Sequence, residues 1–295
     1  MTNNINVQEQ NYKKPSAGSI IGGALAGSVV QGAVSTPKQI IAPLILEKVQ
    51  KISRELTADE FTQVEKAVLD TIKNSGLEAK GVSVIKATSE NAKEISEIML
   101  REINNAPLFK YLPKKVKEFA GKTISSMIAS GNNACYTFLS KKIIMPEKEL
   151  NLSLFHEAGH AMNANLSKFG KILQKCRPMV LLACPISLIA LFKTKKAPNQ
   201  EPKNNLDKAT TFIKDNAGKL TFAAFIPMLV EEGLASLKGN KFAKQLLSPE
   251  LAKKVAKTNA LGFSTYLVTA TLSGLGIYLG AKVKDAIASN KPIEK

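Results

Sequence analysis

The sequence has no Trp, only two His and only three Cys among its 295 residues. Aromatic residues amount to 6%, a content that disfavours an aromatic-rich sheet core and favours a mainly helical protein. The cysteines, at positions 135, 176 and 184, form neither a CxxC pair nor an even set. This spacing argues against a small secreted domain held together by disulfides.

Arginine is scarce as well, since it occurs only at positions 54, 101 and 177, although the formal net charge is +17. Lysines therefore supply nearly all of the positive charge, and they are scattered through every polar segment. A nucleic-acid-binding protein usually gathers Arg and aromatic residues on one face, so we predict no nucleic-acid partner. A basic surface beside an anionic membrane explains the charge better.

Four stretches are long, apolar and free of charged residues: 17–36, 178–192, 220–230 and 258–281. A membrane-spanning helix needs about 20 mainly apolar residues, so the first and last stretches qualify by length and the middle two are short. The spacing of Gly23 and Gly27 favours close packing against another helix. We therefore predict apolar helices embedded in a membrane. The alternative is a cytoplasmic protein in which these stretches are core helices.

The chemistry is concentrated in the segment His156-Glu-Ala-Gly-His160. Residues four apart on a helix share one face, and two imidazoles in that arrangement can hold one Zn²⁺. Glu157 is placed to take a proton from a water molecule that the metal activates. The small Ala158 and Gly159 would let a second element approach the metal closely. The motif is only moderately specific, but these are the only histidines in the chain, which makes a chance match a poor explanation.

A catalytic zinc usually has three protein ligands, and no third His exists here. Glu231 and Glu232 directly follow the apolar run 220–230. A charge at the end of an apolar run needs a partner, and a metal cation would be one. Pairing of these glutamates with lysines is the alternative interpretation.

In these features the chain resembles the gluzincins, HExxH peptidases whose third zinc ligand is a Glu on a later helix. Glu232-Gly-Leu-Ala matches their E-G-x-A context, so the resemblance implies Glu232 as the ligand and Glu231 as the fallback. The order of elements over residues 132–240 resembles the membrane-embedded family of the CAAX prenyl proteases and heat-shock membrane peptidases. That order runs from Asn133-Ala134 through a strand at Ile143-Ile144 and the HExxH helix to an apolar hairpin and the Glu-bearing helix.

The chain departs from that family in two ways. Ser236 stands where the family has an Asp that supports a His ligand, so Ser236 is the candidate for that supporting role. The hairpin segments are short, and Pro185 and Pro227 interrupt them. The sequence His-Glu-Ala-Gly-His-Ala also occurs in membrane-tethered AAA proteases. This chain has no GxxxxGK[ST] motif, which excludes that interpretation.

The predicted fold is mainly α with a small β element, an α+β zincin-like arrangement with short edge strands. We divide the chain into an apolar Gly-rich N-terminal segment (1–43), a helical scaffold or lid (44–131), a zincin-like core with the apolar hairpin (132–240), and a C-terminal apolar helix with a basic tail (241–295). Strands are expected at 81–87, 134–139 and 142–145, and a helix from 148 to 173 is expected to carry the HExxH motif.

The predicted function is a membrane-associated zinc endopeptidase that uses one Zn²⁺, with a peptide or protein as substrate. Tyr136 and Tyr266 are candidates for stabilising the oxyanion. Two alternatives remain: a soluble zincin-like peptidase, and a non-catalytic membrane-associated protein whose basic loops bind anionic lipid. The loop lysines concerned are Lys193, Lys195, Lys196 and Lys203.

Overall fold

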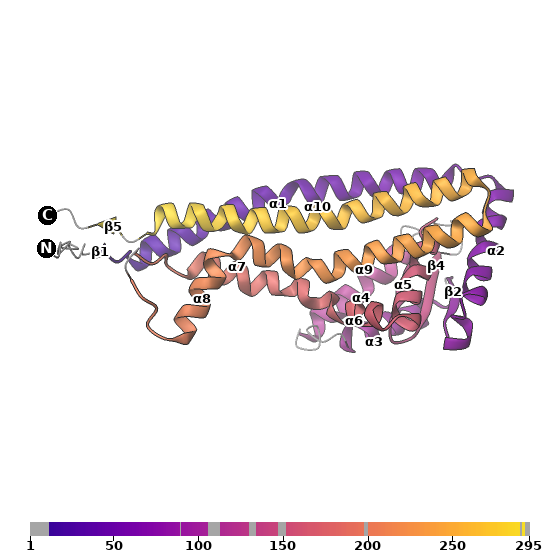
Figure 1. The fold of residues 1–295 in the computed structure, drawn as a ribbon, viewed down its shortest axis with the longest axis horizontal. Coiled ribbons are helices and arrows are strands. Elements are labelled where there is room, and N and C mark those ends of the chain that lie inside the picture. Colours follow the sequence, from indigo (N-terminus) through magenta and orange to yellow (C-terminus); the bar gives the residue numbers. More distant parts are fainter. Residues whose placement is uncertain are drawn as a thin grey trace, which may run out of the picture. The chain divides into compact units, whose positions relative to one another are not determined.

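The computed structural model describes residues 12–88, 90–105, 113–129, 134–146, 152–197, 200–289 and 291–292, which form a mainly helical protein with a small three-stranded sheet (Figure 1). Asn133 and the expected helix start at residue 148 lie outside these residues. The chain divides into two compact units. The first comprises Met1–Pro37, Leu182–Ala224 and Thr269–Lys295, and the second comprises Lys38–Leu181 and Phe225–Val268.

Three long helices contribute residues to both units: α1 (Ala17–Arg54), α9 (Ala217–Leu246) and α10 (Pro249–Ile287). The remaining helices of the second unit are α2 (Ala58–Asn74), α3 (Ala92–Asn105), α4 (Lys114–Ala129), α5 (Leu154–Leu166), α6 (Lys168–Cys176) and the short η1 (Glu78–Lys80). A 3₁₀ segment, η3 (Arg177–Leu182), leads into the first unit, which holds α7 (Ala183–Phe192), α8 (Asn205–Asp215) and the two-residue strands β1 (Tyr12–Lys13) and β5 (Lys291–Pro292).

Local sequence signals set the start and end of α2. Thr57 caps the helix, because its hydroxyl accepts from the Glu60 N–H at 3.2 Å while the Glu60 carboxylate accepts from the Thr57 N–H at 2.9 Å. Gly76 follows the helix with φ of 77°, a conformation that glycine adopts without steric cost. The apolar residues Val64 and Val68 are buried in the main core of the second unit.

The sheet of the second unit has the strand order β2–β4–β3. Strand β2 (Ser83–Ala87) runs parallel to β4 (Lys142–Pro146), and β3 (Cys135–Thr137) pairs antiparallel with β4. Ile143 and Ile144 in the central strand are fully buried. The predicted strands are therefore present, and β3 forms an edge of the sheet. The strand expected over 134–139 is shorter than predicted, because residues 138–141 form the turn that lets Thr137 pair with Lys142.

The expected single helix over 148–173 is wrong in one respect. The chain forms two helices, α5 and α6, separated at Ser167, whose backbone is extended with φ −132° and ψ 121°. The Ser167 hydroxyl accepts from the Gly170 N–H at 3.0 Å and caps α6. Because Gly170 has no side chain, its backbone lies against that of Asn163, which an added Cβ would approach within 2.5 Å. The chain therefore turns back directly after α5.

Among the described residues, four helical segments are long and apolar enough to cross a membrane: α1, residues 168–192, α9 and α10. The expectation that the runs 178–192 and 220–230 are too short to span a membrane is therefore wrong. The helical segments that contain them extend beyond the charge-free residues. Pro227 lies inside the 30-residue α9 without ending it. Between 11% and 44% of the most apolar part of each segment is buried within the protein, so most of the residues there are not covered by other parts of the chain. Such uncovered surface is compatible with a membrane.

In the first unit, glycines bring α1 and α10 into backbone contact. A Cβ on Gly27 would lie 2.6 Å from the Gly280 carbonyl oxygen, and one on Gly23 would lie 3.0 Å from the Lys284 carbonyl oxygen. The contact confirms the close packing expected from the Gly23–Gly27 spacing. Small residues at such a crossing allow more van der Waals contact between helices than larger side chains would.

We expect Gly27→Ala to destabilise the protein by about 1–3 kcal/mol, because the added methyl group overlaps Gly280 and Leu191. Gly22→Ala is the matched control on the same helix, since a Cβ there meets nothing within 4 Å. Thermal unfolding of both variants in detergent tests this expectation. Equal melting temperatures for the two variants would contradict it.

Two lysines of the first unit are buried around a single acid. Lys214 on α8 and Lys284 on α10 are 4% and 0% exposed, and both donate to the Lys193 carbonyl oxygen, Lys214 at 2.8 Å. Both also pair with Asp285. Burial lowers the pKa of Lys214 to about 8, and the Lys284 charge acts in the same direction, although Asp285 opposes the shift.

Stability should therefore rise as the pH increases from about 8 to 10.5, since over this range the unfolded chain holds more protons on Lys214 than the folded chain does. The variant Lys214→Met has no ammonium group at this position, so it should lose this part of the rise of stability with pH. Exposed Lys208 on the same helix serves as the control, because Lys208→Met should leave the rise unchanged. Melting temperatures of the three proteins across this pH range provide the measurement.

Candidate metal centre

Helix α5 carries the His156–His160 motif and is almost entirely buried. All residues from Glu157 to Ala164 are buried, and Leu154 and Phe155 belong to the main core of the second unit. The surrounding core fixes the helix on every side. His156 and His160 therefore have set positions one turn apart, with their ring centroids separated by 4.4 Å.

Helix α9 lies directly against α5 because two glycines remove the side chains that would separate them. A Cβ on Gly159 would lie 2.0 Å from the Ala235 carbonyl oxygen, and one on Gly239 would lie 2.4 Å from the Phe155 carbonyl oxygen. The small residue expected at 159 thus has the role inferred from the sequence. Backbone contact at both points brings Glu231 and Glu232 of α9 to the histidines.

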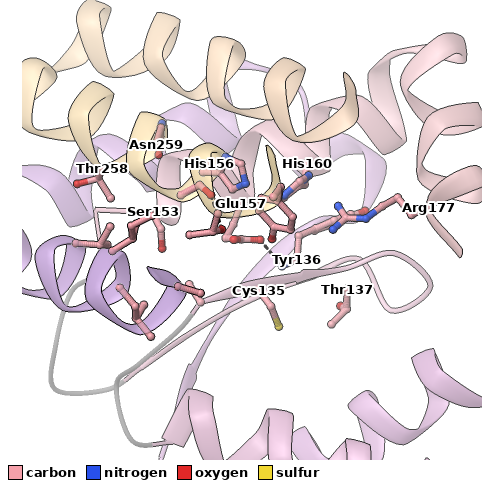
Figure 2. A pocket seen from close by; sticks show the side chains of 18 of the residues that line it. Cys135, Tyr136, Thr137, Ser153, His156, Glu157, His160, Arg177, Thr258 and Asn259 are labelled. Atoms are coloured by element: carbon pink, nitrogen blue, oxygen red, sulfur yellow. Dashed lines mark hydrogen bonds between the residues drawn. The ribbon is translucent and has the colours of Figure 1, made fainter. Parts of the chain in front are cut away.

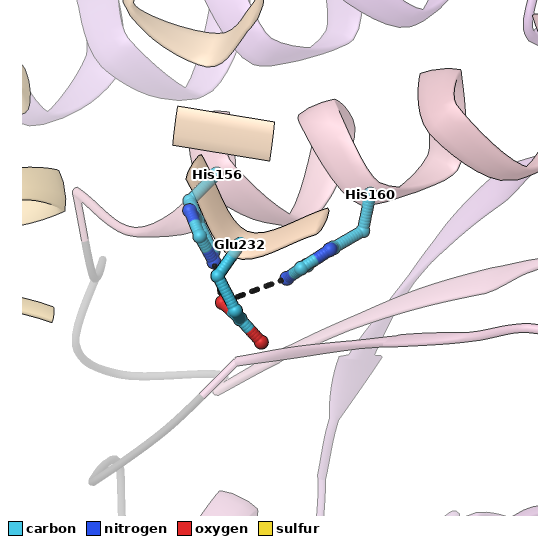
Figure 3. A group of neighbouring side chains, drawn as sticks. All are labelled: His156, His160 and Glu232. Carbon is cyan, nitrogen blue, oxygen red and sulfur yellow. Dashed lines mark hydrogen bonds and ion pairs between the residues drawn. The ribbon is translucent and has the colours of Figure 1, made fainter. Parts of the chain in front are cut away.

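His156, His160 and Glu232 form a group that could hold a metal ion (Figure 3). The Glu232 Oε2 atom lies 2.9 Å from His156 Nε2 and 3.5 Å from His160 Nε2. One donor atom from each of the three residues lies within 4.8 Å of the others. Two imidazole nitrogens and one carboxylate oxygen therefore converge on a common point.

The other nitrogen of each ring has its own partner. His156 Nδ1 lies 3.0 Å from the Ser236 hydroxyl, and His160 Nδ1 lies 2.8 Å from Glu231 Oε1. Glu231 also accepts from Asn163 Nδ2 at 3.0 Å and from Gln174 Nε2 at 2.6 Å. Contacts of this type fix the orientation and tautomer of metal-binding histidines. Glu231, the fallback ligand, thus faces the outer nitrogen of His160, while Glu232 faces the inner nitrogens of both rings.

Arg177, at the start of η3, joins the two glutamates. Its Nη1 donates to Glu231 Oε2 at 2.7 Å and its Nη2 donates to Glu232 Oε1 at 2.6 Å. Both carboxylates are fully buried. A buried carboxylate without a compensating charge is very unfavourable, so the guanidinium allows the pair to lie in the interior. Oε2 of Glu232, the oxygen nearest the histidines, is left free of this contact.

Glu157 is bound by the edge strand β3 of the sheet and not by α9. The Tyr136 N–H donates to Glu157 Oε2 at 2.7 Å (Figure 2). Burial raises the pKa of Glu157 above its ordinary 4.5, although the two histidines and this N–H act against the shift. A carboxyl group with a raised pKa exchanges protons with a reacting group more readily than an ordinary surface glutamate.

Burial also disfavours a proton on His160, but the Glu232 and Glu231 carboxylates outweigh that effect and raise the pKa of His160 to about 10. The site thus favours positive charge between its carboxylates. A metal cation at the same place would satisfy the same electrostatic demand.

A cavity of about 660 Å³ lies beside the motif and is open to His156, Glu157 and His160 (Figure 2). Apolar residues of α1 line part of the cavity, and residues of β3 and of α10 line other parts. The α1 residues are Ala42, Pro43, Ile45, Leu46 and Val49, and the residues of β3 and α10 include Tyr136, Thr137, Asn259, Gly262 and Tyr266. The volume is in the range of ligand-binding pockets.

The two tyrosines proposed as oxyanion donors both line this cavity. The Tyr136 hydroxyl accepts from Asn165 Nδ2 at 2.7 Å, which leaves its own proton available for donation. Burial raises the pKa of Tyr136 to about 12, so the hydroxyl stays protonated at neutral pH. Tyr266 approaches the same cavity from α10.

Comparison with protein-family models, with curated proteins and with solved structures found no match to this chain.

Sequence reasoning named the histidines and both glutamates but missed the residues that organise them, namely Asn163, Gln174 and Arg177. For Arg177 a signal was present, because Arg is rare in this chain, occurring at only three positions while Lys supplies nearly all of the basic residues. A fork-shaped guanidinium can contact two carboxylates at once, which an ammonium does less well. The backbone N–H that holds Glu157 leaves no trace in the sequence.

We expect Gly159→Ala to push α9 away from α5 and to separate Glu232 from the histidines, because the new methyl group overlaps the Ala235 carbonyl. The variant should lose metal affinity and about 1–3 kcal/mol of stability or more. Gly233→Ala is the matched control, since its Cβ would meet only Phe263 at 3.7 Å, an ordinary contact. Metal content after dialysis and thermal unfolding test both variants, and parental metal binding by Gly159→Ala would contradict the assignment.

Proposed function

We propose that the chain is a zinc-dependent endopeptidase associated with a membrane, with Glu157 as its general base. The observation that carries the proposal is the convergence of His156, His160 and Glu232 beside a cavity into which Glu157 also faces. Two imidazoles and one carboxylate, with a position left open, are a common donor set of catalytic zinc. Magnesium and calcium prefer oxygen ligands and would be poorly served by two nitrogens.

Zn²⁺ at this position would supply a Lewis acid that polarises a peptide carbonyl and lowers the pKa of a water molecule. Glu157 would accept the proton of that water and return it to the leaving amine. The Tyr136 N–H orients the Glu157 carboxylate for both transfers. Ser236 and Glu231 hold the histidines in position, as supporting residues do in other zinc sites.

Arg177 would balance the charge of the two buried glutamates and keep Glu232 pointing at the histidines. The hydroxyls of Tyr136 and Tyr266 are the candidate donors to the developing oxyanion, because both line the cavity. An extended peptide would lie in the cavity with apolar side chains against α1. These roles are those of a gluzincin mechanism, and the gluzincins are the family that the segment Glu232-Gly-Leu-Ala resembles.

The apolar helices support a location in a membrane. Exposed Leu25, Val29 and Ile40 on α1 are 64%, 72% and 59% accessible, which is unfavourable in water and favourable in lipid. With four such segments, we favour a membrane peptidase over a soluble one.

The proposal is tested with Glu157→Gln and Glu232→Ala in purified, detergent-solubilised protein. Glu157→Gln should keep about one Zn²⁺ per chain and reduce peptide hydrolysis by about 10²–10⁴-fold, since it removes the proton acceptor but no ligand. Glu232→Ala should lose both metal and hydrolysis. Zinc is measured by elemental analysis, and hydrolysis with a quenched-fluorescent peptide mixture.

Exposed Glu97 on α3 provides the control, because Glu97→Gln makes the same chemical change away from the site. It should retain full zinc content and activity. Two results would overturn the proposal: cleavage by Glu157→Gln at the parental rate, or parental protein that binds no stoichiometric zinc.

A further inference from the structure

The first unit contains a second cavity, which is strongly basic and unrelated to the metal centre. Its volume is about 240 Å³, and five lysines line it together with one acid, Asp207. Five positive charges and one negative charge leave an excess of four positive charges. The lysines are Lys14, Lys193, Lys195, Lys196 and Lys203. Four of them belong to the loop between α7 and α8, and Lys14 precedes α1.

Asp207 organises these lysines. Its carboxylate pairs with Lys193, accepts from Lys196 Nζ at 2.5 Å and accepts from the Lys203 N–H at 2.8 Å. Hydrogen bonds from Lys193 and Lys196 hold the pKa of Asp207 well below its usual range, so it stays charged. Asp207 thus holds the Lys193 and Lys196 ammonium groups and the Lys203 backbone at the cavity, and its single negative charge offsets only part of the positive charge of the lining.

Two of these lysines, Lys193 and Lys195, are bound through their backbone to other parts of the unit. The Lys193 carbonyl accepts from the buried ammonium groups of Lys214 and Lys284, which come from α8 and α10. Lys195 forms a parallel bridge with Ser289, just beyond α10. These contacts fix the backbone at two of the lysines that line the cavity, Lys193 and Lys195.

The position and shape of the cavity indicate its ligand. Lys193 directly follows the apolar segment 168–192, and Lys14 lies three residues before α1, so these two lysines stand at the ends of two segments able to cross a membrane. Lipid phosphates occupy that level of a bilayer. The described residues that line the cavity include no aromatic side chain on which a nucleobase could stack.

We propose that this cavity binds the phosphate group of an anionic phospholipid. The lysines would contact the phosphate oxygens as point charges, while the acyl chains extend along the apolar faces of α1 and α7. Neither Zn²⁺ nor Glu157 is involved. Lipid binding and peptide hydrolysis can therefore fail independently, and Glu157→Gln should bind lipid as the parent does.

Binding is measured by calorimetry on the full chain in a nonionic detergent, with a short-chain phosphatidate as the probe. We expect one saturable site, and the variant Lys14→Gln/Lys203→Gln should weaken it about tenfold or more, because two of the five cationic contacts are lost. Lys208→Gln/Lys219→Gln is the control. It removes the same charge from exposed positions of the first unit that do not line the cavity, and it should bind like the parent.

Two further probes separate the possible sources of the phosphate. Short-chain phosphatidylcholine should bind much more weakly than phosphatidate, and inorganic phosphate should compete only at far higher concentration. Equal binding of phosphatidylcholine, or equal weakening in both double variants, would overturn the site. If inorganic phosphate alone bound as tightly as phosphatidate, the ligand would be a soluble phosphate and the lipid assignment would be wrong.

Discussion

The candidate metal centre depends on the backbone contact between α5 and α9. Gly159 lies against Ala235, and Gly239 lies against Phe155, so the two helices touch without intervening side chains at the residue directly before each histidine. A carboxylate side chain is short, and Glu232 reaches both Nε2 atoms only because the helices are this close. Any larger residue at position 159 would widen the gap beyond that reach.

Around this contact, each buried carboxylate of the site has a hydrogen-bond or ion-pair partner. Arg177 donates to one oxygen of each glutamate, and Glu231 forms a hydrogen bond with Nδ1 of His160. The Tyr136 N–H of the edge strand donates to Glu157. What remains directed at the common point is one oxygen of Glu232 and the two inner imidazole nitrogens. The interior of the protein thus tolerates several acids while leaving one small region that favours a cation.

The sequence allowed prediction of those features that depend on neighbouring residues. The α2 capping box, the strands and the one-turn spacing of the histidines are local patterns, and each is present in the structure. The end of α5 at Ser167 was missed, because it results from Gly170 packing on Asn163 after a reversal of the chain. The roles of Arg177 and of the Tyr136 N–H depend on contacts across more than 20 positions, which periodicity and spacing do not encode.

The order in which the parts of the site occur along the chain also determines when the site can assemble during translation. His156 and His160 precede Glu232 by more than one apolar helix, and the cavity wall is completed only by residues of α10 such as Tyr266. A ribosome-bound chain that has passed the histidines therefore holds an incomplete ligand group until α9 has emerged. The nascent protein remains without an assembled centre for most of its translation, and fragments that end before α9 never acquire one.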